Sequence, residues 1–313
     1  MNNSPAAQTP TCTPAASSHM MTRPLIISDL LEYAAAHHGN QQIISRRLEG
    51  DIHSYSYREA LARSKQLANA LDFLGVKPGD RVATLAWNGY RHLECYYAIS
   101  GMGAICHTVN PRLYSEQIEY IINHAEDCYV FLDACFARLL EPVADKLTSV
   151  RGFIFMIDED QMPATSLPNP MNYEALLAAH SAEFQWPDFS ADTAACLCYT
   201  SGTTGNPKGV LYSHASTVLH AYASRNPDAL NISADSVVMP VVPMYHVCAW
   251  GMPYIAPIAG ATLVLPGDGM DGKSLHELID YAQVDLMLGV PTVWLMLLQH
   301  LKESGKKMPH LQR

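Results

Sequence analysis

The sequence predicts an α/β fold in which mostly parallel sheets are flanked by helices. Two observations predict it: strand-like and helix-like segments alternate from Leu25 onward, and several of the helices carry recognisable caps. Strands that are joined through helices in a βαβα order run parallel, and they need helices on both faces of their sheet. With 313 residues, 49% of them apolar and 16% charged, the chain is long enough for two units with cores of their own.

The first half shows the alternation most clearly. Ser56 and Glu59 form the capping box of a helix that ends at Gly75. Apolar runs predict strands over residues 81–87, 104–109, 129–132 and 153–157. Helices are expected over about 90–100, from 116 behind a cap at Ser115, from 136 and from 173. We therefore expect a disordered tail over 1–24, a first α/β subdomain over 25–190 and part of a second over 191–313.

The second half contains an uncharged run from Ser236 to Gly267 that is long enough to raise the question of a membrane span. Its prolines and glycines break a single helix repeatedly, so a buried strand, a loop, a short helix and a strand over 262–265 are predicted instead. Ser274 and Glu277 form a second capping box. The remaining elements are expected to be strands over 194–198, 209–212 and 286–290, and helices over 214–224 and 292–303, the last ending at Gly305.

Composition narrows the classes of partner. The net charge of −10, with no basic stripe, argues against a nucleic-acid partner and favours small molecules. The eight cysteines contain no C-x-x-C pair and lie mostly in apolar runs, as expected for reduced residues of a cytoplasmic protein. Residues 1–24 lack the basic start and apolar core of a signal peptide.

The run from Tyr199 to Gly209, Tyr-Thr-Ser-Gly-Thr-Thr-Gly-Asn-Pro-Lys-Gly, has the chemistry of a phosphate-binding loop. Its glycines allow positive φ and close approach of backbone N–H groups, while four hydroxyls and one ammonium group suit phosphate oxygens. An ordinary Gly/Ser/Thr surface turn is the alternative, but eleven such residues between two strand-like segments argue against it. The spacing also differs from the P-loop of kinases and GTPases.

This loop closely resembles the signature of the adenylate-forming, or AMP-binding, superfamily, which includes acyl-CoA synthetases, luciferases and peptide-synthetase adenylation domains. The resemblance implies that the loop holds the β- and γ-phosphates of ATP, that Lys208 adds charge or fixes the loop, and that Thr200 touches Mg²⁺. The nucleotide-binding residues implied in this way are Thr200, Ser201, Gly202, Thr203, Thr204, Gly205 and Lys208.

A second cluster, Pro243-Met244-Tyr245-His246-Val247 with Trp250 beyond it, lies in the uncharged run. A lone histidine there is usually a core residue with a satisfied hydrogen bond. The resemblance instead implies that His246 lies beside the reacting carboxylate as a catalytic residue, and that Trp250 gates a fatty-acid tunnel. Tyr245 and Val247 would line the same acyl pocket.

From Leu25 to its last residue, the chain looks most like bacterial medium- and long-chain fatty acyl-CoA synthetases. A small-acid enzyme such as an acetyl-CoA synthetase is the near competitor, but the apolar lining favours an alkyl chain. The resemblance implies that a fatty acid and ATP, with Mg²⁺, form an acyl-adenylate, from which the thiol of CoA displaces AMP. A homodimer and peripheral membrane contact are also compatible with it.

Later motifs of the superfamily do not occur before Arg313. We therefore expect an incomplete large N-terminal domain without the C-terminal domain, and no activity from this chain alone. The alternative is a nucleotide- or acyl-binding module without catalysis, or the product of a decayed ligase gene.

Overall fold

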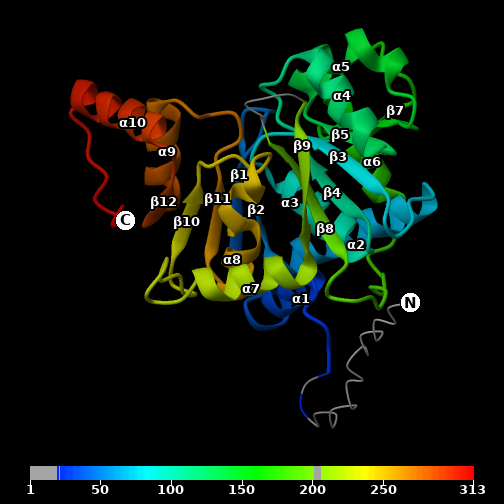
Figure 1. The fold of residues 1–313 in the computed structure, drawn as a ribbon. Coiled ribbons are helices and arrows are strands. Elements are labelled where there is room, and N and C mark those ends of the chain that lie inside the picture. Colours follow the sequence, from blue (N-terminus) through cyan, green and yellow to red (C-terminus); the bar gives the residue numbers. More distant parts are fainter. Residues whose placement is uncertain (1–19, 21, 201–205) are drawn as a thin grey trace, which may run out of the picture.

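Two β-sheets surrounded by helices make up the fold in the computed structural model, which describes residue 20, residues 22–200 and residues 206–313 (Figure 1). The larger sheet has the strand order β7-β6-β5-β3-β4-β8-β9. Every neighbouring pair in it is parallel except β8 with β9. Its strands are β3 (Arg81–Leu85), β4 (Ile105–Thr108), β5 (Tyr129–Leu132), β6 (Phe153–Phe155), β7 (Pro170–Asn172), β8 (Ala194–Thr200) and β9 (Lys208–Ser213).

The smaller sheet has the order β12-β10-β11-β1-β2, and only the hairpin of β1 and β2 is antiparallel. The prediction of mostly parallel sheets with helices is therefore confirmed. The strands are β1 (Gln42–Arg46), β2 (Ile52–Ser56), β10 (Val237–Pro240), β11 (Thr262–Leu265) and β12 (Leu286–Leu288). In Figure 1, this sheet lies beside the larger one, with α9 and α10 at its outer edge.

Helices connect the strands and fill the space around them. Those of the first half are α1 (Ile27–His37), α2 (Tyr57–Phe73), α3 (Tyr90–Gly101), α4 (Ser115–Ala125), α5 (Ala137–Leu140) and α6 (Tyr173–Ala178). Those of the second half are α7 (His214–Ser224), the 3₁₀ segment η4 (Val247–Gly251), α8 (Met252–Ala259), α9 (Gly272–Ala282) and α10 (Pro291–Ser304). Every residue of α3 is buried. The Tyr96 ring of α3 lies 5.8 Å from the Tyr254 ring of α8, so one core joins helices from both halves of the chain.

The two sheets do not divide the chain at residue 190. Strands β1 and β2 come before that position, yet β1 pairs with β11; strands β8 and β9 come after it, yet β8 pairs with β4. A subdomain boundary at 190 stays a prediction that the sheet order does not reproduce. The tail predicted over 1–24 lies mainly outside the described residues.

The cap predictions had mixed outcomes. The Ser56 capping box is confirmed, with the backbone N–H of Ser56 donating to Glu59 Oε2 at 2.8 Å, and so is the end of α10 at Gly305, whose φ is 68°. The box at Ser274 is wrong. Asp271 caps α9 instead, accepting from the backbone N–H of Lys273 and of Ser274, both at 3.0 Å, because its carboxylate stands where those donors open the first turn.

The predicted cap at Ser115 is also wrong, because α4 already includes that residue. In the uncharged run, the predicted strand, loop, short helix and strand are confirmed as β10, the stretch 241–246, α8 and β11. The 3₁₀ segment η4, which follows the loop, was not predicted. Over the described ranges, no helix has the length and apolarity needed to cross a bilayer.

Candidate functional site

The flanks of the predicted phosphate loop form an antiparallel hairpin. Tyr199 pairs with Gly209 and Thr200 with Lys208, and the Thr200 hydroxyl donates to the Lys208 carbonyl at 3.5 Å. The predicted strand-to-strand connection is thus confirmed, and its two ends bring the exposed side chains of Thr200 and Lys208 to the same end of the sheet. The predicted loop residues Ser201, Gly202, Thr203, Thr204 and Gly205 lie outside the described residues.

The segment η4 has an unusual backbone. Its four non-glycine residues, 247 to 250, have φ between 47° and 55°, and Gly251 has φ 81°. A left-handed conformation is uncommon for any side chain and least favourable for a β-branched one such as Val247, so the surrounding packing must hold this turn. Two features favour glycine at position 251: its positive φ, and the ring of His220, which would lie 2.7 Å from an added Cβ atom.

A cavity of about 270 Å³ opens against this turn. Trp250 and Val247, two of the predicted acyl-pocket residues, line it, and 42% of Trp250 is exposed. The walls are mainly apolar with a few hydroxyl and imidazole groups, as in pockets for organic ligands. The cavity is lined by Tyr212, Ser216, Thr217, His220, Val247, Cys248, Trp250, Gly251 and Tyr254, which come from β9, α7, η4 and α8.

Tyr245 and His246 lie outside this lining. Tyr245 is buried, its ring lies 6.1 Å from that of Trp87, and burial raises the pKa of its hydroxyl. His246 is exposed, and its backbone N–H donates to the Pro243 carbonyl at 3.1 Å. Of the four predicted residues, Val247 and Trp250 therefore line the cavity, whereas Tyr245 and His246 come just before it in the chain.

Sequence comparison identifies the chain. The AMP-binding enzyme family matches residues 31–313. This chain belongs to that family. Among its curated relatives are the 3-methylmercaptopropionyl-CoA ligase of Ruegeria lacuscaerulensis, 48% identical, and the medium-chain-fatty-acid–CoA ligase of Ectopseudomonas oleovorans, 47% identical. Both alignments cover 94% of this chain and 54% of the relative, so the chain spans about half the length of these proteins.

A solved structure supports the same fold at lower identity. The anthranilate CoA ligase AuaEII, crystallised with anthranoyl-AMP, superposes with a TM-score of 0.82 at 20% identity, over 92% of this chain and 54% of that one. At that identity, the likeness shows the fold alone.

In this AMP-binding chain, one buried residue that the sequence did not single out fixes the backbone before His246. The side chain of Asn88 donates to the carbonyls of Pro240 at 2.8 Å and Val242 at 2.9 Å, and it accepts from the Met244 N–H at 2.7 Å. A buried amide with three such bonds holds a loop in one conformation. The only signal in the sequence is an asparagine directly after a buried strand.

Proposed function

We propose that the protein containing these residues is a fatty acid–CoA ligase that uses ATP and releases AMP. A fatty acid, ATP and CoA would be its substrates, with an acyl-adenylate as intermediate. Family membership and the names of the two relatives support the ligase class. A cytoplasmic location, a homodimer and peripheral membrane contact belong to the same proposal and stay predictions.

The cavity beside η4 is the observation that carries the choice of substrate. Among the residues that the structure describes, its lining contains no Asp, Glu, Lys or Arg, and it is formed largely by aromatic and aliphatic atoms. Moving an alkyl chain from water into such a site is favourable, whereas a charged acyl group would lose its hydration without gaining a partner. The two relatives have nearly equal identity to this chain but are named for different acids, so the residues around the acyl group matter more for selectivity than overall similarity does.

We assign the phosphates of ATP to the loop between β8 and β9. Thr200, Ser201, Gly202, Thr203, Thr204 and Gly205 would supply hydroxyl and backbone donors, and Lys208 the positive charge. Mg²⁺ prefers hard oxygen ligands, and the Thr200 hydroxyl is one. Within the described ranges, no group of three carboxylate or imidazole side chains lies close enough together to hold such an ion, so phosphate oxygens would supply most of its ligands. When bound, Mg²⁺ would neutralise phosphate charge.

We also propose that His246 contacts the substrate carboxylate. It is exposed at the start of η4, one residue before Val247 of the cavity wall. A chain lying in the cavity could therefore present its carboxylate near this imidazole.

Trp250→Ala tests the assignment of the cavity. In the active enzyme, the variant should change the ratio of kcat/KM for octanoate to that for palmitate, because the ratio reports differential transition-state binding. Trp294→Ala is the matched control, since Trp294 lies in α10, outside the cavity lining. An unchanged ratio in Trp250→Ala, with activity on both acids lowered in parallel, would remove the indole from the acyl site.

The ligase class has a separate test. Fatty-acid-dependent exchange of pyrophosphate into ATP by the active protein should require both octanoate and ATP. Exchange that does not depend on any carboxylic acid would refute the class, whatever the outcome for Trp250.

A further inference from the structure

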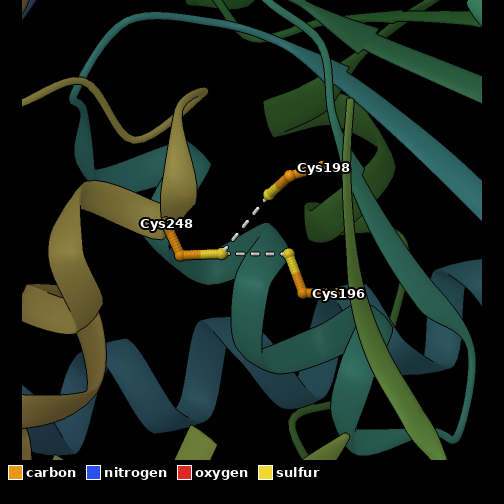
Figure 2. A group of neighbouring side chains, drawn as sticks. All are labelled: Cys196, Cys198 and Cys248. Carbon is orange, nitrogen blue, oxygen red and sulfur yellow. Dashed lines mark hydrogen bonds between the residues drawn. The ribbon is translucent and has the colours of Figure 1, made fainter. Parts of the chain in front are cut away.

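Three cysteine side chains from two distant parts of the chain converge (Figure 2), and one of them, Cys248, also lines the cavity. Cys248 Sγ lies 3.0 Å from Cys196 Sγ and 3.9 Å from Cys198 Sγ. All three sulfur atoms lie within 4.8 Å of one another, and over the described ranges no other group of three or more His, Cys, Asp or Glu side chains converges in this way.

The fold explains how the three thiols meet. Cys196 and Cys198 are two residues apart in β8, so their side chains lie on the same face of the sheet. Cys248 reaches them from the left-handed turn η4, where its φ is 48°. The exposed fractions of Cys196, Cys198 and Cys248 are 1%, 6% and 8%, so bulk solvent barely reaches the cluster.

We propose that this cluster binds one divalent d¹⁰ cation, such as Zn²⁺, through the three thiolates. Thiolates are soft ligands that select zinc-like or monovalent copper ions over magnesium or calcium. A tetrahedral zinc ion with Zn–S bonds of about 2.3 Å holds its sulfur atoms about 3.8 Å apart. The 3.9 Å separation of Cys198 and Cys248 already fits this spacing, and the 3.0 Å contact of Cys196 would open by about 0.8 Å.

Charge favours a divalent ion. Binding removes three thiol protons to solvent, so three thiolates and Zn²⁺ carry a net charge of about −1, against about −2 with Cu(I). A smaller uncompensated charge is less costly in a buried site. The Thr108 hydroxyl, 3.2 Å from Cys198 Sγ, is placed to donate a hydrogen bond to a metal-bound sulfur.

The cavity supplies the fourth ligand and the route of entry. Cys248 lies in its wall, so water in the cavity can complete the tetrahedron. The ion would tie β8, which runs on to Thr200 of the phosphate loop, to η4, which carries Trp250. This inference does not depend on the ligase proposal, because it concerns only the thiols of the folded chain.

The test is titration of the reduced chain with Cd²⁺ and Co²⁺ under anaerobic conditions. We expect one ion per chain, release of about three protons per ion, thiolate-to-metal charge-transfer absorption and, for Co²⁺, the d–d bands of a tetrahedral site. Bound metal should also raise the melting temperature of the chain.

Cysteine variants locate the site. Cys198→Ser and Cys248→Ala should each weaken Cd²⁺ binding by at least about 100-fold, more than the loss of an outer-shell partner. Cys135→Ser, which removes an exposed thiol outside the cluster, should bind like the parent protein. Cys106→Ala controls for loss of a buried thiol next to Cys196, because Cys106 pairs with it across β4 and β8 but is not part of the cluster.

Three results would overturn the proposal: less than one Cd²⁺ bound per reduced parent chain, equal binding by Cys198→Ser and the parent, or absorption without thiolate charge transfer. The parent titration stands even if a variant fails to fold. If the reduced protein takes up no metal but forms a Cys196–Cys248 disulfide in air, the cluster is an oxidation-sensitive thiol pair instead of a metal site.

Discussion

Asp133 follows β5 and is a buried carboxyl group whose charge can be removed without changing its shape. Its Oδ2 accepts from the backbone N–H of Trp87 at 2.7 Å. Burial raises the pKa of Asp133 to about 7, although the Trp87 N–H and Arg91 act to lower it. The negative charges of Glu49 and Asp268 raise the pKa of Asp133 further. In Asp133→Asn, the amide keeps an acceptor for Trp87 but cannot ionise.

The raised pKa of Asp133 determines the sign of the pH effect. Between pH 3.8, the ordinary pKa of an aspartate, and about pH 7, the folded chain binds one more proton at this site than the unfolded chain. Stability therefore falls as pH rises through this interval, by about 1.4 kcal/mol per pH unit. The full interval corresponds to about 4 kcal/mol, and the part from about pH 5 to about pH 6.5 to roughly 2 kcal/mol.

Urea unfolding of the parent and of Asp133→Asn at several pH values measures this contribution. The other titrating groups occur in both proteins, so their effects cancel in the difference between the two free energies of unfolding. This difference should shift by about 2 kcal/mol in favour of the variant as pH rises from about 5 to about 6.5. Asp51→Asn is the matched control. The Asp51 side chain is 55% exposed, and Arg47 lowers its pKa, so it is ionised in both states over this range and its difference should stay flat. A flat difference for Asp133→Asn as well would refute the reasoning.

The remaining predictions concern stability and use the same urea assay. Arg91→Met should lower the free energy of unfolding by about 3 to 5 kcal/mol, because the guanidinium pairs with three carboxylates in a largely buried network. Lys77→Met is the control: Lys77 belongs to an exposed ion pair at 3.7 Å, so its loss should cost less than about 1 kcal/mol. Gly50→Ala should cost about 1 kcal/mol for its φ of 96° alone, and Gly251→Ala clearly more, because its Cβ also meets an imidazole ring; equal costs would argue against that contact. The buried ring of His214 accepts a hydrogen bond from a backbone N–H at the start of α1, and burial lowers its pKa to about 4. The stability that this neutral ring contributes should therefore be lost as pH falls from about 6.5 to about 4. His214→Gln should lack this pH dependence.

Local patterns predicted most elements but not their partners in the sheets. The alternation of helix and strand, the Ser56 cap and the hairpin around the phosphate loop can be read from neighbouring residues. The β1–β2 hairpin and α1 were not predicted. Strand β1 pairs with β11, where Ile43 lies opposite Leu263, and no local period can indicate a neighbour so distant in the chain.

The cysteine cluster illustrates the same limit at a site. In the sequence, Cys196 and Cys198 look like ordinary apolar residues of a buried strand, and the interpretation as structural thiols followed from that. Nothing near Cys248 predicts that it turns toward them, because that depends on the left-handed backbone of η4. The assignment of Trp250 to an acyl pocket came from family resemblance and stays a prediction, whereas its place in the wall of a cavity comes from the structure.

The turn η4 shows why local sequence rules do not predict where its side chains lie. Left-handed φ values at four successive non-glycine residues cost about 1 to 3 kcal/mol each, so local preference opposes the turn and only packing can maintain it. Buried Ala249 and Cys248 provide that packing, while the more exposed Val247 and Trp250 lie beside Cys248 in the cavity wall. A single strained segment thereby exposes an indole to one ligand site and delivers a thiol to another. Sequence rules based on local preference fail where the structure opposes that preference, and here those residues are the ones assigned to binding.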